Sequence, residues 1–319
     1  MKKIELKKIK LDNGETMAYR HVGSGENKLV LIHGFQSSSQ FFEDLLESLD
    51  ENIEVFAPDL IGYGESSYEN KHKEMKEWAE DLKYFVDSLD IDNFSLVGWS
   101  LGGQVAMDFA GLFPEKIRQL ILIASVGVKG FVMPKDKEVN DENKKLKLPN
   151  FLKNFNIKHD HSFTVPILNG IKDQDIDFFE DLFRQTIYNV NDPNPDDLRK
   201  MAEDFLKQRC FLESLLAMVT YNNTNENGSG LIENINKKVT WIHGDKDMVV
   251  PIDDAYESIE YFPNKVNFIK FDNSGHAVFV DEKEKFIEIF EDLIKNEDWK
   301  FIDIFRISFY NFDYSCNLW

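Results

Sequence analysis

Short apolar runs alternate with amphipathic stretches over the first 127 residues and again after residue 236. Runs typical of buried parallel strands occupy 29–32, 53–57, 94–97, 117–124, 239–243 and 266–271. Apolar residues recur at helical spacing over 41–49, 75–89, 101–112 and 281–295. Strands that alternate with helices in this way predict an α/β fold, with a mostly parallel central sheet and helices on both faces.

The N-terminal segment has a different pattern. Residues 4–9 and 17–21 alternate between apolar and polar side chains on either side of the pair Asn13-Gly14. An Asn-Gly pair supplies the left-handed backbone that a tight hairpin turn requires. We therefore expect the sheet to begin with two antiparallel strands.

The alternation stops between residues 128 and 235. This segment has helical patterns around 175–188 and 196–221, separated by the proline-containing stretch 191–195, and no convincing buried strand. The sequence thus predicts a core built from residues 1–127 and 236–296, with a helical insertion at 128–235.

A serine lies where the strand pattern at 94–97 changes into the helix pattern at 101–112. Gly98 and Gly102 flank Ser100 at a spacing of two residues. A strand that becomes a helix within two residues needs a strained turn, which glycines permit because they lack a Cβ atom. We expect this turn to hold Ser100 out of the sheet, at the positive end of the following helix. The alternative is a tight turn with a purely structural serine.

This Gly-x-Ser-x-Gly turn, between a strand and a helix, resembles the nucleophile elbow of the α/β-hydrolase family. The resemblance implies that Ser100 is a nucleophile and that the insertion at 128–235 is a helical cap. It also implies an oxyanion hole formed by the backbone N–H groups of Phe35, which follows His33-Gly34, and of Leu101. His33 itself is expected to be structural, as is the loop at 59–67.

The same resemblance supplies the other two members of a catalytic triad. Asp247 lies three residues after Gly244 and four before Pro251, the family's spacing for the acid, whereas Asp245 is expected to shape the loop. His276 follows the final predicted strand, where the family keeps its catalytic base. The chain order is then Ser100, Asp247, His276.

Apolar side chains near the elbow and in the insertion are candidates for a substrate pocket. The candidates are Trp99, Phe179, Phe183, Phe211 and Leu215. Ordinary helix packing is the competing interpretation for each of them. Arg184 and Arg209 are expected to form ion pairs rather than bind substrate, and the His159-Asp160-His161 stretch to be a loop rather than a metal site.

Composition narrows the possible partners. The formal net charge of −20 disfavours binding to nucleic acid or to an anionic membrane surface. No apolar run approaches the roughly 18 residues of a membrane-spanning helix, and residues 1–10 lack the apolar segment of a signal peptide. These features predict a cytoplasmic protein. Residues 297–319 are rich in aromatic side chains and suggest a homo-oligomer contact, with docking on the protein itself or an aggregation liability as the alternatives.

The sequence as a whole predicts a serine hydrolase that needs no metal and no cofactor. The expected reaction cleaves a carboxylic ester, thioester or lactone of a small, largely apolar molecule through an acyl-Ser100 intermediate. Carbon–carbon bond hydrolysis and cofactor-free perhydrolysis remain open with the same residues. A small-molecule receptor built on a hydrolase scaffold is an alternative from another functional class.

Overall fold

The computed structural model describes residues 3–132 and 157–296. The expected aromatic tail at 297–319 and residues 133–156 of the expected cap lie outside these ranges. Within the described residues, no helix is long and apolar enough to cross a membrane.

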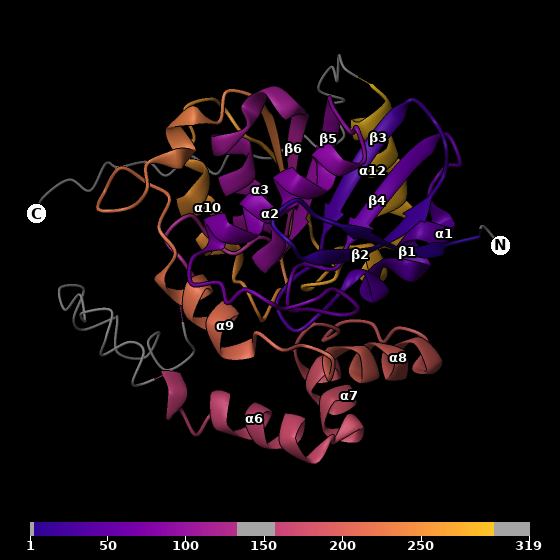
Figure 1. Cartoon of the computed structure of the whole chain (residues 1–319), viewed down its shortest axis with the longest axis vertical. Coiled ribbons are helices and arrows are strands. Elements are labelled where there is room, and N and C mark those ends of the chain that lie inside the picture. Colours follow the sequence, from indigo (N-terminus) through magenta and orange to yellow (C-terminus); the bar gives the residue numbers. More distant parts are fainter. Residues whose placement is uncertain (1–2, 133–156, 297–319) are drawn as a thin grey trace, which may run out of the picture.

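A single eight-stranded sheet forms the centre of the molecule (Figure 1), in the order β1-β2-β4-β3-β5-β6-β7-β8. The strands are β1 (Glu5–Lys10), β2 (Thr16–Val22), β3 (Asn27–Ile32), β4 (Ile53–Pro58), β5 (Phe94–Trp99), β6 (Ile117–Ile123), β7 (Lys238–Gly244) and β8 (Asn267–Phe271). Every pairing from β4 to β8 is parallel. The predicted fold class is therefore confirmed. The central strand β5 is buried along its whole length, as a strand covered on both faces must be.

The antiparallel start of the sheet is also confirmed. Strand β1 pairs with β2 from Glu5 opposite His21 to Lys10 opposite Thr16, and β2 pairs antiparallel with β4. The turn contains Gly14 at a φ of 94°, a backbone conformation that glycine adopts without steric cost.

Helices cover both faces of the sheet. Figure 1 shows α2 and α3 in front of the strands and α12 behind them. The helices outside the insertion are α1 (Glu43–Ser48), α2 (Met75–Ser88), α3 (Leu101–Leu112), α10 (Ile252–Ile259), α11 (Val278–Asp281) and α12 (Lys283–Lys295). The helices on the two faces bury the sheet between them, which is why its strands are continuous apolar runs rather than alternating apolar and polar residues.

Four described helices lie between β6 and β7. They are α6 (Thr164–Asp173), α7 (Ile176–Gln185), α8 (Pro195–Phe205) and α9 (Phe211–Thr220). Figure 1 shows all four on one side of the sheet, beyond the ends of its strands. Helix α6 was not predicted from the sequence.

The helical pattern expected over 196–221 is broken in two. Helix α8 ends at Phe205 and α9 begins at Phe211. In the break, the backbone N–H of Arg209 donates to the carbonyl of Gly62 at 2.8 Å, and its guanidinium donates to the carbonyl of Ser66. A contact with a distant loop therefore overrides the local helical periodicity.

Candidate active site

Ser100 is the single residue between β5 and α3. Its φ of 56° and ψ of −122° lie in a region that residues with a side chain rarely occupy. Backbone hydrogen bonds hold it there: its N–H donates to the carbonyl of Ile123 at 3.0 Å, and its own carbonyl accepts from Gly103 at 3.0 Å and Val126 at 3.1 Å. The strained turn predicted from the sequence is therefore present.

Glycine is required on both sides of this turn. A Cβ atom on Gly98 would lie 2.3 Å from the carbonyl oxygen of Gly102. A Cβ atom on Gly102 would lie 2.4 Å from the carbonyl oxygen of His33. Both contacts are with backbone, which cannot move aside, so the two positions exclude any larger residue.

The loop that follows β3 lies against the serine. A Cβ atom built on Gly34 would be 2.9 Å from the Cβ of Ser100 and 3.4 Å from its Oγ. Leu101 is the first residue of α3, so its N–H has no acceptor within the helix. The N–H of Phe35 likewise donates to no acceptor in the described part of the chain. Both of the predicted oxyanion donors are thus available beside Ser100, and their catalytic role remains a prediction.

His33 fixes this loop in place. Its ring is fully buried, with Nδ1 2.8 Å from the carbonyl of Gly34 and Nε2 accepting from the N–H of Leu60 at 3.0 Å. Burial lowers the pKa of His33, so the imidazole is neutral and carries its proton on Nδ1. This arrangement fits the structural role expected for His33.

The loop at 59–67 supports the same region. Both carboxylate oxygens of Asp59 accept backbone N–H groups, from Ser39 at 2.9 Å and from Glu65 at 2.9 Å. The hydroxyl of Ser66 donates to the Asp59 carbonyl at 2.6 Å. Asp59 therefore ties the segment after β3 to the segment after β4.

Asp247 and His276 meet at the carboxyl ends of β7 and β8. The Nδ1 of His276 lies 2.8 Å from Oδ2 of Asp247, and both side chains are buried. The other oxygen, Oδ1, accepts the N–H groups of Val249 at 2.8 Å and Val250 at 2.9 Å. Burial alone would raise the pKa of Asp247. Electrostatic attraction to His276 and hydrogen bonds from His243 and His276 outweigh it and hold that pKa well below its usual value.

His243 is a neighbour of this pair that sequence reasoning missed. Its Nδ1 accepts from the indole N–H of Trp241 at 3.2 Å, so Nε2 carries the proton and donates to the carbonyl of Val250 at 2.8 Å. The same Nε2 lies 3.4 Å from Oδ2 of Asp247. Its position directly before Gly244, at the end of β7, was the available signal.

The loop that carries His276 packs against the residue before the serine. The indole N–H of Trp99 donates to the carbonyl of His276 at 3.0 Å, and the two ring centroids are 5.4 Å apart. Within the described residues, no hydrogen bond joins Ser100 Oγ to the His276 ring. Such bonds are often long in a site without substrate and tighten when it binds.

Two carboxylates hold the His276 loop from its other side. Asp281 accepts from the N–H of Gly275 at 2.7 Å and from the N–H of Asn191 at 3.0 Å. Glu282 accepts from the hydroxyl of Ser274 at 2.8 Å. Asp281 therefore connects the His276 loop with the inserted segment, and burial raises its pKa.

The pocket candidates fall into different surroundings. The Phe211 ring of α9 lies 5.3 Å from Phe35 in the loop beside Ser100. Trp99 is buried among the rings of Phe41, Phe42 and Phe279. Phe211 and Trp99 therefore contact loops that carry the proposed catalytic groups.

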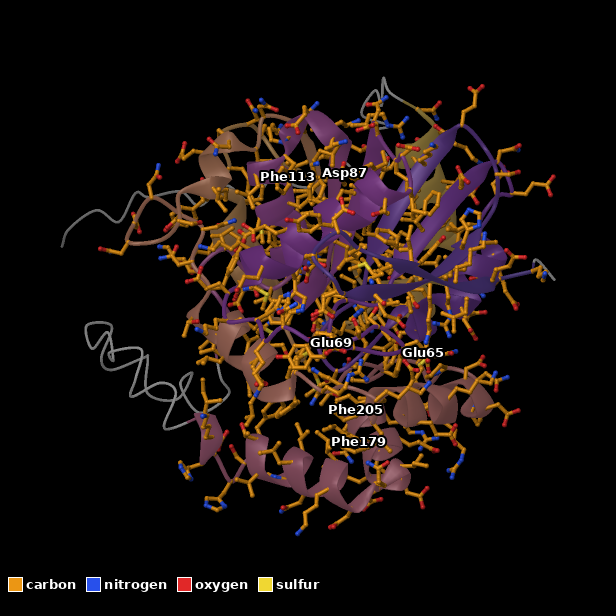
Figure 2. All side chains as sticks on the ribbon, viewed as in Figure 1. Glu65, Glu69, Asp87, Phe113, Phe179 and Phe205 are labelled. Atoms are coloured by element: carbon orange, nitrogen blue, oxygen red, sulfur yellow. The ribbon has the colours of Figure 1, made fainter. Side chains whose placement is uncertain are left out.

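Phe179 and Phe183 pack within the inserted helices. Phe179 lies 4.5 Å from Phe205, a pairing that is labelled in Figure 2. The Phe183 ring contacts Phe41 of the core, with the ring centroids 5.5 Å apart. Leu215 is buried in α9. Helix packing explains Phe179 fully, and a pocket role for these residues stays a prediction.

The remaining charged candidates have local partners. Arg184 lies within 3.6–3.8 Å of carboxylates on Glu180, Asp181 and Asp192. Asp245 lies 3.6 Å from Lys270. In the described part of the chain, no group of three or more His, Cys, Asp or Glu residues is placed to hold a metal ion.

Comparisons with known proteins identify the fold family of the chain. Residues 27–283 match the family model described as alpha/beta hydrolase fold. The chain is 27% identical over 286 residues to a pimeloyl-[acyl-carrier protein] methyl ester esterase of Nitrosomonas europaea, covering 87% of this chain and all of that one. It is 31% identical over 128 residues to a 2-hydroxy-6-oxo-2,4-heptadienoate hydrolase of Pseudomonas putida, covering 39% of this chain and 46% of that one. The solved structure of an esterase from Rhodococcus sp. ECU1013 superposes with a TM-score of 0.66 at 20% identity, covering 91% of this chain and 98% of that one.

Proposed function

The chain belongs to the α/β-hydrolase fold family, and from this premise we propose that it is a serine hydrolase acting on a carboxylic ester. One observation carries the proposal. His276 is joined to the buried Asp247 at 2.8 Å, and its loop is packed on Trp99, the residue that precedes the strained Ser100. A nucleophile, a base and an acid that orients the base are the groups that acyl transfer needs.

The proposed reaction starts with proton transfer. Because Nδ1 of His276 is bound to Asp247, Nε2 is the basic nitrogen, and it takes the hydroxyl proton as Ser100 Oγ attacks the carbonyl carbon. The N–H groups of Phe35 and Leu101 stabilise the negative charge that develops on the carbonyl oxygen. His276 then protonates the leaving alcohol as its C–O bond breaks, which leaves an acyl-Ser100 ester.

Water completes the cycle. His276 removes a proton from a water molecule, which attacks the acyl carbon, and Ser100 leaves with that proton as the carboxylic acid is released. Throughout both halves, the charge on Asp247 stabilises the imidazolium form of His276.

Two features support a small, largely apolar ester as the substrate. The relative from Nitrosomonas europaea is named as a methyl ester esterase, and it aligns with this chain over its full length. The Phe211 ring on α9 also lies 5.3 Å from the ring of Phe35, whose N–H is a proposed oxyanion donor. An acyl or alcohol group bound at Ser100 would therefore meet an aromatic side chain.

Labelling with a fluorophosphonate tests the nucleophile. We expect the wild-type protein to be labelled and Ser100→Ala to be unlabelled, while Ser125→Ala, a neighbouring buried serine, retains labelling. Absence of labelling in folded wild-type protein would favour the receptor interpretation. A panel of p-nitrophenyl esters of increasing acyl length then locates the chain-length optimum.

The Pseudomonas putida relative supports a second candidate, hydrolysis of a carbon–carbon bond by the same residues. Its similarity covers only 39% of this chain, which places it second. Assaying 2-hydroxy-6-oxo-2,4-heptadienoate beside the ester panel separates the two. A kcat/KM for the dienoate more than tenfold above that of every ester would replace the ester proposal.

A further inference from the structure

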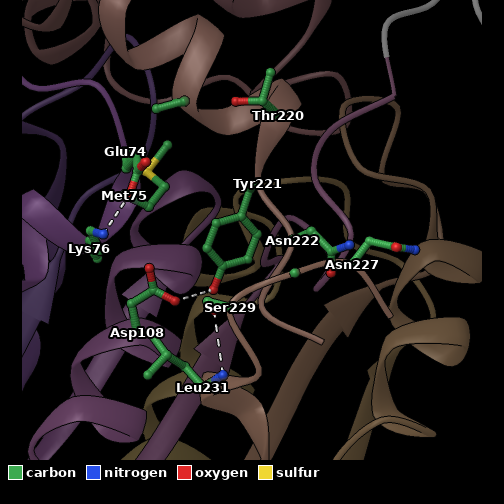
Figure 3. Close-up of a pocket in the computed structure, with 12 residues that line it drawn as sticks. Glu74, Met75, Lys76, Asp108, Thr220, Tyr221, Asn222, Asn227, Ser229 and Leu231 are labelled. Atoms are coloured by element: carbon green, nitrogen blue, oxygen red, sulfur yellow. Dashed lines mark hydrogen bonds and ion pairs between the residues drawn. The ribbon is translucent and has the colours of Figure 1, made fainter. Parts of the chain in front are cut away.

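A cavity lies apart from the Ser100 elbow (Figure 3). It has a volume of about 390 Å³ and opens between the start of α2, the second half of α3, and the end of α9 with its following loop. Its lining comprises Glu74, Met75, Lys76, Asp108, Ala217, Thr220, Tyr221, Asn222, Asn227, Gly228, Ser229 and Leu231. None of these residues belongs to the proposed catalytic machinery.

Asp108 is the buried charge of this cavity. Only 4% of the residue is exposed, and its Oδ1 accepts from the hydroxyl of Tyr221 at 2.9 Å. Its second oxygen, Oδ2, has no hydrogen-bond or ion-pair partner among the described residues, and Figure 3 shows it turned away from Tyr221. Oδ2 can therefore accept a hydrogen bond from a donor on a molecule bound in the cavity.

The other charged groups around Asp108 do not donate a hydrogen bond to Oδ2. Lys76, on α2, is the one cation in the lining, and its Nζ forms an ion pair with Glu74 at 2.8 Å. Tyr221, directly after α9, faces Asp108 with the hydroxyl already described. With Asp108 ionised, these side chains sum to one negative charge.

Burial raises the pKa of Asp108 to about 7. A bound cation would hold this carboxyl in its ionised form near neutral pH.

We propose that this cavity binds a small organic cation, whose primary ammonium group donates a hydrogen bond to Oδ2 of Asp108. The volume lies within the range typical of small-ligand sites. Met75, Ala217 and Leu231 provide apolar surface for a short alkyl chain. The ligand class is thus an alkylamine rather than an inorganic metal ion, which would require several oxygen ligands at once.

Calorimetry at pH 8 with n-butylammonium and with n-butanol tests this assignment on the full chain. The two probes have the same number of heavy atoms and differ in charge. We expect wild-type protein to bind n-butylammonium at least tenfold more tightly. Equal affinity for the two probes, or no binding of the ammonium at millimolar concentration, would overturn the proposal without recourse to any variant.

A matched pair of variants assigns the binding to Asp108. Asp108→Asn keeps the side-chain shape and the hydrogen bond from Tyr221. It should weaken the binding of n-butylammonium at least tenfold and leave the affinity for n-butanol unchanged. Asp253→Asn, which removes an exposed carboxylate on α10, should change neither affinity. Unchanged ammonium binding by Asp108→Asn refutes the site.

Two further measurements separate this cavity from the proposed active site. Ser100→Ala should bind n-butylammonium as the wild type does, whereas loss of binding would place the ammonium at the catalytic groups instead. The wild-type affinity should also fall as the pH is lowered from 8 to 6, because protonated Asp108 no longer attracts a cation. A flat profile over this range contradicts the proposal.

Discussion

Replacing Asp247 by Asn separates the charge of the proposed triad acid from its shape. Both backbone N–H groups that bond Oδ1, from Val249 and Val250, require an acceptor at that position. The oxygen of the new amide must therefore take the Oδ1 position, and its NH₂ group must take the Oδ2 position. There it faces Nδ1 of His276, which donates a proton to Asp247 in the wild type.

Two donors cannot face one another, so His276 should shift its proton to Nε2 in Asp247→Asn. The nitrogen that must accept the Ser100 proton would then be occupied. The equivalent change in a serine protease lowers kcat about 10⁴-fold, which corresponds to about 5 kcal/mol in the activation free energy. We expect a loss of that order in the hydrolysis of a p-nitrophenyl ester at pH 7.5.

Asp245→Asn is the matched control, because it removes a carboxylate from the same loop whose side chain meets Lys270 instead. It should change kcat by less than about threefold. The reasoning is wrong if Asp247→Asn retains more than a tenth of the wild-type kcat, or if Asp245→Asn loses as much activity. Circular dichroism and the melting temperature of both variants establish that each is folded.

Three further outcomes follow from the structure. Gly98→Ala should destabilise the fold by about 3 kcal/mol or more through a backbone clash, while Gly14→Ala, with open space around it, should cost only about 1–2 kcal/mol; urea unfolding compares the two. Phe211→Ala should lower kcat/KM for the best ester about tenfold and shift the acyl-length optimum, whereas Phe179→Ala should reduce stability and leave that optimum in place. The pKa of Asp108 rises from 3.8 to about 7 on folding, so the wild-type free energy of unfolding should decline by up to about 4 kcal/mol relative to that of Asp108→Asn as the pH rises from 4 to 8. Urea unfolding of both proteins across this pH range measures the difference, and parallel curves of unfolding free energy against pH would contradict the expectation.

Patterns that depend on neighbouring residues could be predicted from the sequence. The apolar runs correspond to strands β3 to β8, and the Gly-x-Ser-x-Gly spacing indicated the turn at Ser100. In each case the signal and the structure it determines lie within about ten residues of one another.

Features that depend on distant partners could not be predicted. The break between α8 and α9 follows from the bond between Arg209 and Gly62, which are 147 positions apart in the chain. The bridge from Asn191 to Gly275 passes through Asp281, a residue whose sequence surroundings are those of an ordinary helix end.

The order of the strands explains why residues so far apart in sequence meet. Loops at the carboxyl ends of parallel strands gather at one edge of a sheet. The loop after β3 carries the Phe35 donor, and the ends of β5, β7 and β8 carry Ser100, Asp247 and His276 in turn. Strand β6 lies between β5 and β7 and sets the spacing, because Val126 bonds the Ser100 carbonyl and Ala124 bonds Ile242.

The same order gives a reason for the place of the insertion. Because the chain leaves β6 at this edge and returns only at β7, the helices between them emerge beside Ser100 without interrupting any strand pairing. Ser38, in the loop after β3, donates a hydrogen bond to Asp204 of α8, and Phe211 of α9 contacts Phe35. An insertion at this point of the chain reaches the proposed catalytic groups directly, so changes in α8 or α9 would alter which molecules reach Ser100 while the sheet and its chemistry stay the same.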